Sequence, residues 1–320
     1  MKDQRVIYIY PKETTGNLYL SSCRSIFELG GAQVKIFPTS LVKLLMMLIF
    51  RKDCIVINWF EDRIYKSPNQ LFLLLKRLVL LMFIRLIFNK VIWVRHNFRP
   101  HNTHSKVIRD FLLFCLDKFT DHQVTHRPVK EINSYYVPHP LYPDKGTCPK
   151  CERDIPFLYF GVIKRYKGLV DLLTYWPISV PLLMVGKCAD DALITELTEI
   201  INNRSLSVRW KQSFLDYSDL SSLICRSMNV VIPHRDQSMI VSGAFYHAVG
   251  LGANVVIRNG DFFQDYLKRF KFVTPFDNTD LAAVIESKQY IDADEVLKTV
   301  KSEFADEVIL DAWEKVFNAN

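Results

Sequence analysis

The chain has 320 residues, of which 49% are hydrophobic and 23% are charged. This length gives room for two domains of ordinary size, and this composition excludes a disordered or low-complexity chain. The charge is uneven. Residues 1–150 carry 23 Lys and Arg against 11 Asp and Glu, whereas residues 151–320 carry 18 against 23. The basic half therefore predicts a polyanion or an anionic membrane surface as its partner.

Membrane spans, secretion and metal binding are not indicated by the sequence. No uninterrupted apolar run reaches the roughly 18 residues of a span, because four basic residues interrupt the apolar segment 71–94. The first residues lead directly into a strand-like run, unlike a signal peptide. The seven cysteines are scattered mostly within apolar segments and predict reduced thiols in a cytosolic protein. Cys148 and Cys151 form a lone CxxC without a second ligand pair, so we expect no metal there.

The first half alternates strand-like and helical segments. Strands are predicted at 5–10, 34–37, 54–59, 90–95, 121–125 and 135–140, and helices at 18–29, 41–50, 69–88 and 106–119. The opening resembles a Rossmann-like β-loop-α-β unit, but it lacks GxGxxG, so a dinucleotide site is not expected.

Polar loops follow three of these strands. Thr15-Gly16-Asn17 follows the first strand, and Trp59 and Asp62 lie at the end of the third. His96, His101 and His104 lie in the loop after the strand 90–95, where an imidazole can act as a general base or bind a hydroxyl or phosphate. The alternative is a surface loop of hydrogen-bonded histidines, and both interpretations stay open.

The segment 41–88 is both apolar and basic. On the helix 69–88, Lys76, Arg77 and Arg85 spread over about half of the circumference, and apolar residues fill the rest. Such a helix can lie in a membrane interface with its basic side chains among the headgroups. It can equally be a core-facing helix with solvated basic residues.

Closely spaced prolines at 138–149 indicate a linker, and the α/β pattern restarts after it. We therefore predict a first domain at 1–145 and a second at 146–320, whose last helix could pack back on the first domain. Strands are expected at 156–160, 181–185, 207–210, 229–233, 254–257 and 272–273, and helices at 169–175, 190–202, 217–227, 243–251, 280–288 and 293–317.

The segment 229–263 stands out, because a polar loop at 235–243 joins a strand to a helix of small residues. In an open parallel sheet, ligands bind beyond the carboxyl ends of the strands. Ser242-Gly243 lies where the helix begins, so free N–H groups and the helix dipole favour an anion there. The segment therefore predicts a phosphate site, most simply for a sugar nucleotide. The alternative is an ordinary βαβ unit in which Ser242 is only an N-cap.

Taken together, several segments resemble motifs of the GT-B glycosyltransferases, closest to the family-4-like enzymes of bacterial surface polysaccharide synthesis. Phe160-Gly161 with Lys164 and Tyr166-Lys167-Gly168 resembles the loop that holds the donor pyrophosphate. Further similar segments are 183–186, 231–235 with Ser242-Gly243, Asn58-Trp59, His96-Asn97 with Pro100-His101, and 137–140.

This resemblance implies an α/β fold of GT-B type, with two Rossmann-like doubly wound domains facing a cleft. It assigns donor binding to Gly161, Lys164, Lys167, Arg235, Ser242, Gly243 and His247. It assigns the acceptor side to Trp59 and His101. Thr15, Gly16 and Asn17 join them as acceptor-side residues because they lie beyond the end of the first strand. The catalytic candidates are His96 and Asp62, with no metal and no cofactor beyond a UDP- or GDP-linked sugar as substrate.

The implied activity is transfer of a hexose-type sugar from a nucleotide diphosphate sugar to a lipid-linked saccharide, in capsule or O-antigen synthesis. The protein would be cytoplasmic, bound peripherally to the inner membrane face through segment 41–88, and would not bind nucleic acid. Val162 replaces the usual arginine, and Met239 and His247 replace the paired glutamates, so retention or inversion of configuration stays open. Two alternatives remain, a non-catalytic partner subunit of a membrane transferase and a sugar-nucleotide epimerase.

Overall fold

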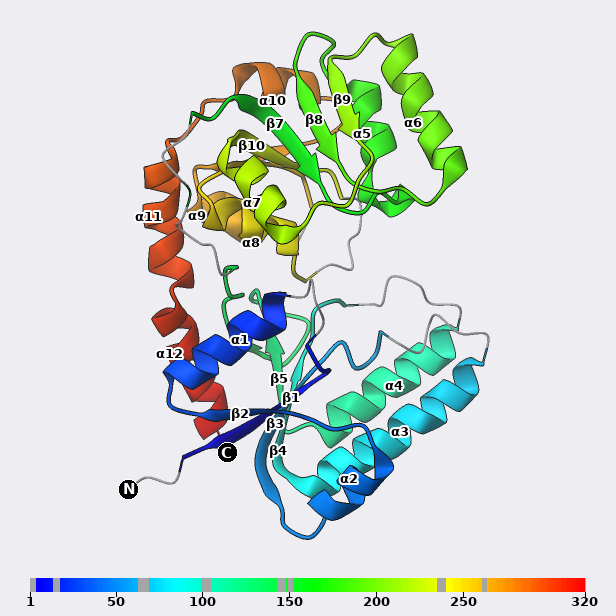
Figure 1. Cartoon of the computed structure of the whole chain (residues 1–320), viewed down its shortest axis with the longest axis vertical. Coiled ribbons are helices and arrows are strands. Elements are labelled where there is room, and N and C mark those ends of the chain that lie inside the picture. Colours follow the sequence, from blue (N-terminus) through cyan, green and yellow to red (C-terminus); the bar gives the residue numbers. More distant parts are fainter. Residues whose placement is uncertain are drawn as a thin grey trace. The chain divides into compact units, whose positions relative to one another are not determined.

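The computed structural model (Figure 1) describes residues 4–13, 18–62, 69–98, 105–142, 148, 152–234, 240–260 and 264–319. The chain divides into two compact units. Unit 1 comprises residues 1–140, 238–241 and 304–320, and unit 2 comprises 141–237 and 242–303. Two segments beyond the predicted boundary at residue 145 thus group with unit 1.

Unit 1 is built on a parallel sheet with the strand order β2-β1-β3-β4-β5-β6. The strands are β1 (Val6–Tyr10), β2 (Gln33–Ile36), β3 (Lys52–Asn58), β4 (Phe88–Val94), β5 (His122–Thr125) and β6 (Tyr135–Tyr136). The strand predicted at 135–140 is therefore only two residues long. Its continuation contains Pro138 and Pro140, which have no backbone N–H to donate to a neighbouring strand.

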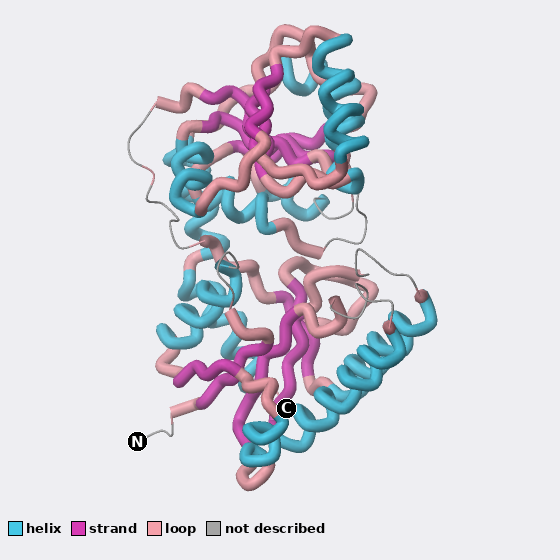
Figure 2. The backbone as a smooth tube through the Cα atoms, turned by 45° about the vertical axis from the view of Figure 1, so that its right-hand side comes forward, coloured by secondary structure: helices cyan, strands magenta, loops and turns pink. Residues whose placement is uncertain are grey.

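Alternation along the strands gives this sheet two apolar faces. Tyr8, Ile55 and Trp93 point to one face, which α2 (Leu41–Met47), α3 (Gln70–Ile87) and α4 (Lys106–Phe119) cover. Figures 1 and 2 show these three helices together on one side of the sheet.

The other face carries Ile9 and Val56 and is covered by α1 (Leu18–Leu29) and α12 (Asp306–Asn318). Phe27 of α1 meets Trp313 of α12 edge to face, with ring centroids 5.1 Å apart. Arg5, just before β1, also pairs with Glu314 at 3.0 Å. The last helix is therefore part of the core of unit 1.

Unit 2 has a parallel sheet with the order β12-β11-β10-β7-β8-β9. The strands are β7 (Ile155–Phe160), β8 (Leu182–Val185), β9 (Val208–Lys211), β10 (Ser227–Ile232), β11 (Asn254–Arg258) and β12 (Val273–Phe276). The helices are α5 (Leu169–Tyr175), α6 (Asp191–Asn203), α7 (Tyr217–Cys225), α8 (Gly243–Gly250), α9 (Gln264–Arg269), α10 (Leu281–Ser287) and α11 (Ala293–Phe304). Helices α5, α6 and α10 pack on one face around Leu172, Leu197 and Leu281.

The helices of this half differ from the prediction in two places. The helix α9 was not expected, because its six residues are too few to show a periodic pattern. The single helix predicted at 293–317 is two helices, α11 and α12, separated at Ala305, whose backbone is extended. Asp306 and Glu307 then occupy the first turn of α12, where acidic side chains interact favourably with the helix dipole.

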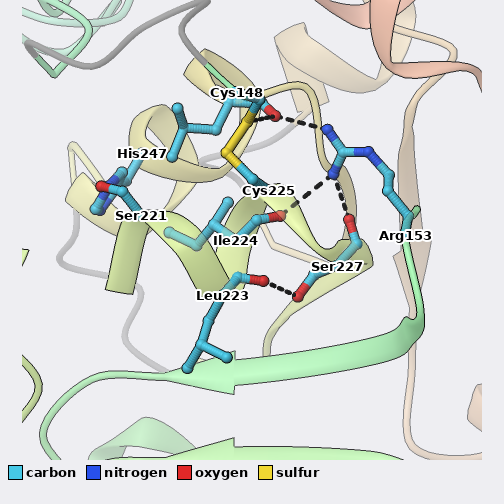
Figure 3. Close-up of a disulfide and its surroundings, with 9 residues drawn as sticks. Cys148, Arg153, Ser221, Leu223, Ile224, Cys225, Ser227 and His247 are labelled. Atoms are coloured by element: carbon cyan, nitrogen blue, oxygen red, sulfur yellow. Dashed lines mark hydrogen bonds between the residues drawn. A yellow bond between two sulfur atoms is a disulfide. The ribbon is translucent and has the colours of Figure 1, made fainter. Parts of the chain in front are cut away.

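The expectation of reduced thiols is wrong for one pair. Cys148 forms a disulfide with Cys225, the last residue of α7, whereas Cys23, Cys54, Cys115 and Cys188 are free and buried. Beside this bond, the Arg153 guanidinium donates to the Ile224 carbonyl at 3.2 Å and to that of Leu251 at 2.7 Å, at the ends of α7 and α8 (Figure 3). Sequence reasoning missed the pair because its cysteines are 77 residues apart.

Removal of this disulfide is expected to destabilise unit 2. A crosslink that closes a loop of this length removes chain entropy from the unfolded state, which corresponds to about 2–4 kcal/mol of unfolding free energy. Cys148→Ser should therefore lower the urea midpoint of the wild type, and a phosphine reductant should lower the wild-type midpoint to the same value. The reductant should leave Cys148→Ser unchanged. An unchanged wild-type midpoint under reduction would contradict the pairing.

Candidate functional site

The topology of unit 2 predicts where a ligand binds. Strand order reverses between β7 and β10, which are neighbours in the sheet although they lie far apart in the chain. At such a switch point, the loops after the two strands diverge and leave a crevice at their carboxyl ends. The segments that follow Phe160 and Ile232 are therefore the first place to look for binding groups.

The loop after β7 is shaped by glycines. Gly161 has φ +122° and Gly168 has φ +74°, both in the region that side chains with a Cβ rarely adopt. Between them, Arg165–Lys167 forms one turn of 3₁₀-helix. Lys164, at the start of this turn, is exposed, and Lys167 is half-buried. The loop thus presents two cations at the carboxyl end of β7.

Lys167 and His234 join the two sides of the switch point. The Lys167 ammonium lies 2.9 Å from Nε2 of His234, which follows β10 after Pro233. Because an ammonium only donates hydrogen bonds, Nε2 is the acceptor. Sequence reasoning included His234 in a similar segment but did not select it as a site residue. Its position directly after a buried strand was the signal that could have identified it.

The beginning of α8 supports anion binding more than simple capping. Ser242 occupies the N-cap position, but its side chain makes no capping hydrogen bond. Its hydroxyl is buried and has no hydrogen-bond partner among the described residues. A buried unsatisfied hydroxyl is costly, and one at a helix N-terminus is placed to donate to an anion. Gly243 follows, and a Cβ built on it would lie 2.6 Å from the Tyr142 hydroxyl, so a larger residue here would require the Tyr142 side chain to shift.

His247 lies on α8, one turn after Gly243, and its side chain is buried. Its ring stacks on Tyr217 at 5.1 Å and lies 4.9 Å from Tyr142. Its Nε2 is 3.1 Å from the Ser221 hydroxyl. Burial lowers the pKa of His247 to about 4, so the imidazole is neutral at neutral pH. His247 therefore packs α8 against α7, with 5% of its surface exposed.

In unit 1 the predicted Trp59 and His96 lie together at the carboxyl ends of β3 and β4. Their rings stack at 4.2 Å, and Trp59 has φ +46°, an uncommon conformation for a bulky residue. Asn58 donates its amide to the Tyr10 carbonyl at 3.2 Å. Its amide oxygen, 3.2 Å from Nε2 of His96, is therefore the acceptor. This assigns the proton of His96 to Nε2 and leaves Nδ1 as a base.

Three further side chains complete this buried polar group. None of them was selected from the sequence as a site residue, although His139 lies in the similar segment 137–140. Tyr19 lies 4.9 Å from the His96 ring, and its hydroxyl is 2.8 Å from Nε2 of His126. His139 packs on the His126 ring at 5.0 Å. Burial lowers the pKa of His96 and His139 well below the ordinary range and that of His126 to about 4. All three imidazoles are therefore neutral at neutral pH.

Asp62 and its neighbour Glu61 differ in environment. Asp62 is half-exposed in the turn after β3, with its N–H 3.3 Å from the Trp59 carbonyl. Glu61 is buried and accepts from the Trp93 indole N–H at 3.2 Å. Burial, with the negative charge of Asp62, raises the pKa of Glu61 to about 8. Asp62 is thus the more accessible of these two carboxyl groups.

Several predicted site residues lie outside the described residues. They are Thr15, Gly16, Asn17, His101 and Arg235. Among the residues that the structure does describe, no cluster of three or more His, Cys, Asp or Glu side chains could hold a metal ion.

Comparison with solved structures identifies the fold class as GT-B. Anabaena HepE, solved with UDP and glucose, superposes with a TM-score of 0.65 at 12% identity, covering 98% of this chain and 99% of that chain. Sucrose-phosphate synthase from Thermosynechococcus elongatus gives 0.69 at 14% identity, with 98% of each chain covered. AviGT4, a glycosyltransferase of avilamycin A biosynthesis, gives 0.64 at 11% identity, covering 98% of this chain and 97% of that chain.

No protein-family model and no curated protein sequence matches the chain. The predicted fold, α/β with two doubly wound sheets of GT-B type, is confirmed.

Proposed function

We propose that this protein is a glycosyltransferase that moves a hexose-type sugar from a nucleotide diphosphate sugar to an acceptor hydroxyl. The observation that carries the proposal is the meeting of Lys167 and His234 at the switch point of unit 2. The buried Ser242 hydroxyl at the start of α8, which has no hydrogen-bond partner among the described residues, supports it. So do the solved GT-B structures, one of which holds UDP and glucose.

The proposed chemistry follows from these groups. The bond between the anomeric carbon and the diphosphate breaks, the acceptor oxygen bonds to that carbon, and the hydroxyl proton passes to a base. Negative charge grows on the leaving diphosphate, where Lys164, Lys167 and the N-terminus of α8 would stabilise it electrostatically. Lysine provides a point charge rather than a fork, so this contact would be less directional than one made by arginine. No metal is required in this scheme.

The acceptor side is proposed to lie with Trp59, His96 and Asp62 in unit 1. A neutral His96 with Nδ1 unprotonated can accept a proton or a hydrogen bond from a hydroxyl. Asp62 is the alternative base if configuration is inverted. A lipid-linked saccharide acceptor in surface polysaccharide synthesis, at the cytoplasmic face of the membrane, is our proposal for the biological reaction. The basic and apolar character of segment 41–88 supports it.

Nucleotide binding tests the donor site directly. A ligand that binds only the folded state stabilises it by about 2.7 kcal/mol at one hundred times its Kd. We expect UDP or GDP, within a panel that also includes TDP, CMP and ADP, to raise the melting temperature of the wild type. Lys167→Ala should lose most of this shift, because it removes a cation from the diphosphate site. The control Lys271→Ala changes an exposed lysine just before β12, at the opposite ends of the strands, and should shift like the wild type.

Other outcomes select other functions. If no diphosphate stabilises the folded wild type, the donor site is refuted and Ser242 only occupies the N-cap position of α8. Binding without release of diphosphate in the presence of acceptors would favour a non-catalytic partner subunit. Turnover of the free sugar nucleotide without any acceptor would favour an epimerase.

A further inference from the structure

Helix α3 exposes an apolar stripe to solvent. Its inner side packs on the sheet through Leu74, Leu81, Ile84 and Ile87. Its outer side carries apolar residues at spacings of three and four, which places them on one line along the helix. They are Phe72, Leu75, Val79, Met82 and Leu86, each between 52% and 66% exposed. An apolar stripe on a surface helix normally faces a partner, and none of the residues that the structure describes covers this one.

The neighbouring helices extend the stripe into a face. On α2 and the turn after it, Leu45, Met46, Ile49 and Phe50 are exposed, and on α4 so are Val107, Phe111 and Phe114. Helix α3 contacts α4, and α2 and α3 line one groove. Figure 1 shows α2, α3 and α4 on the same side of the sheet. We call the exposed side of α2, α3 and α4 the docking face. Contiguous apolar surface of this kind marks an interaction site.

The charge on this face selects the partner. Helix α2 with the turn after it, together with α3, contains five basic residues and no acidic residue, namely Lys43, Arg51, Lys76, Arg77 and Arg85. Helix α4 adds Lys106, Arg109 and Lys118 against Asp110 and Asp117, so the three helices carry more basic than acidic residues. Apolar residues interleaved with basic ones match a bilayer interface, where apolar groups enter the acyl region and cations meet anionic headgroups. A second copy of the chain would instead bring positive charge against positive charge.

A groove between α2 and α3 opens on the same face. It has a volume of about 490 Å³, and Leu44, Leu73, Leu80 and Phe83 contribute apolar walls. Lys76 and Arg77 also line it. The Arg77 guanidinium donates to the Tyr10 hydroxyl and lies 5.3 Å from the Phe60 ring centroid. An apolar groove with two cations matches a hydrocarbon chain that carries a phosphate.

Tyr10 links the groove to the group around His96, whose Tyr19 and Trp59 pack on the α1 side of the sheet. Tyr10 lines the groove, and its carbonyl accepts from the same Asn58 amide whose oxygen faces His96. A lipid seated in the groove would therefore have its headgroup near the carboxyl ends of β1 and β3.

We propose that the docking face binds an anionic lipid bilayer, and that the groove between α2 and α3 takes one chain of a phosphorylated bilayer lipid whose phosphate meets Lys76 and Arg77. The inference deepens the proposed function by giving the acceptor side a physical route to a membrane. Among the described residues, no helix has the length and hydropathy to cross a bilayer.

The test is sedimentation of the full chain with vesicles, without nucleotide, at low salt. Vesicles of phosphatidylcholine mixed with phosphatidylglycerol should carry the wild type down, and vesicles of phosphatidylcholine alone should bind about tenfold more weakly or less. Val79→Glu, at an exposed site in the stripe, should weaken binding by about tenfold or more. Lys76→Gln should weaken it about fivefold. Phe214→Glu, at an 80% exposed apolar residue of unit 2, is the matched control and should bind like the wild type.

Three results would overturn the docking proposal. The first is a wild type that ignores anionic vesicles. The second is displacement from the vesicles by an equal concentration of inorganic phosphate, which would make the ligand a free anion. The third is a wild-type dimer in sedimentation velocity that Val79→Glu dissociates, which would make a second copy the occupant. The nucleotide panel uses no lipid, so failure here and failure of the donor site are distinguishable.

Binding of a single lipid in the groove is tested separately from binding of the docking face to a bilayer. A short-chain phosphatidic acid, kept below its micelle concentration, presents one phosphate and its chains without a bilayer. It should raise the melting temperature of the wild type, and less so that of Lys76→Gln. An unchanged melting temperature alongside intact vesicle binding would refute the groove and leave the docking face.

Discussion

The Gly186→Ala variant is expected to lose more than about 3 kcal/mol of unfolding free energy, much of what stabilises a domain. Gly186 follows β8, and a Cβ built on it would lie 2.0 Å from the carbonyl oxygen of Gly161. Neither main-chain segment can move away without weakening a backbone hydrogen bond. Gly161 donates its N–H to Val185 at 3.0 Å, and Gly186 donates its own to Lys211 at 3.1 Å. The contact is between two main chains, so no side-chain rotation relieves it.

Urea unfolding followed by circular dichroism measures this effect. Gly260→Ala is the matched control, because a Cβ there meets no described atom within 4 Å, and it should stay within about 0.5 kcal/mol of the wild type. If Gly186→Ala does fold, Gly161 must have moved, and diphosphate binding should fall with it. A variant with the midpoint and nucleotide response of the wild type would refute this account of the loop.

Acidification from pH 7 to pH 5 is expected to destabilise both units. His126 in unit 1 and His247 in unit 2 have folded-state pKa values of about 4, below the ordinary value of 6.5. Between these values the unfolded chain binds more protons than the folded chain, so unfolding free energy falls as pH falls. Each of the two histidines should contribute a loss of about 2 kcal/mol between pH 7 and pH 5.

The effect of Glu61 on the unfolding free energy has the opposite sign to that of the histidines, so it must be included for unit 1. Its folded pKa is raised to about 8, so it contributes stability that is present below its ordinary value of 4.5 and lost as pH rises towards 8. Acidification therefore returns some stability to unit 1 through Glu61. The histidines in unit 1 outnumber it, because the pKa values of His96 and His139 are also lowered.

Urea titrations at pH 7, 6 and 5 check this prediction. His247→Gln keeps an amide that can hydrogen-bond to the Ser221 hydroxyl but does not titrate. The unfolding free energy of this variant should therefore fall less between pH 7 and pH 5 than that of the wild type. In unit 1, Glu61→Gln should steepen the fall with acid, because the opposing group is removed. Stability that is constant or rises on acidification would contradict the buried neutral histidines.

Local pattern predicted most of the secondary structure and the fold. The helices expected at 18–29 and 106–119 have those bounds in the structure, and the alternation of strands and helices indicated two parallel sheets correctly. These features depend on periodicity and turn chemistry, which act over a few residues. The short helix α9 and the break at Ala305 carry no such signal.

The candidate site was less predictable, because its contacts join distant parts of the chain. Lys167 and His234 are 67 residues apart, and Tyr19 and His126 are 107 apart. Loop position selected Lys167, Trp59 and His96, but it could not show which side chains pack around them. The helix 69–88 illustrates the same limit. Its composition suits both a core helix and an interfacial one, and only packing shows that apolar residues occupy its solvent side.

The division of the chain also limits how the protein can be dissected. Residues 238–241 belong to unit 1, where the Ile240 N–H donates to the His96 carbonyl at 3.2 Å, and the chain returns to unit 1 again at residue 304. A fragment ending at residue 140 would lack Trp313, and α12 would no longer cover its part of the α1 side of the sheet. Arg5 also donates to Asn318 at 2.9 Å, which brings the start of β1 close to the end of α12. Circular permutation, with 304–319 joined by a short linker ahead of residue 4, is therefore the natural design for an isolated unit 1.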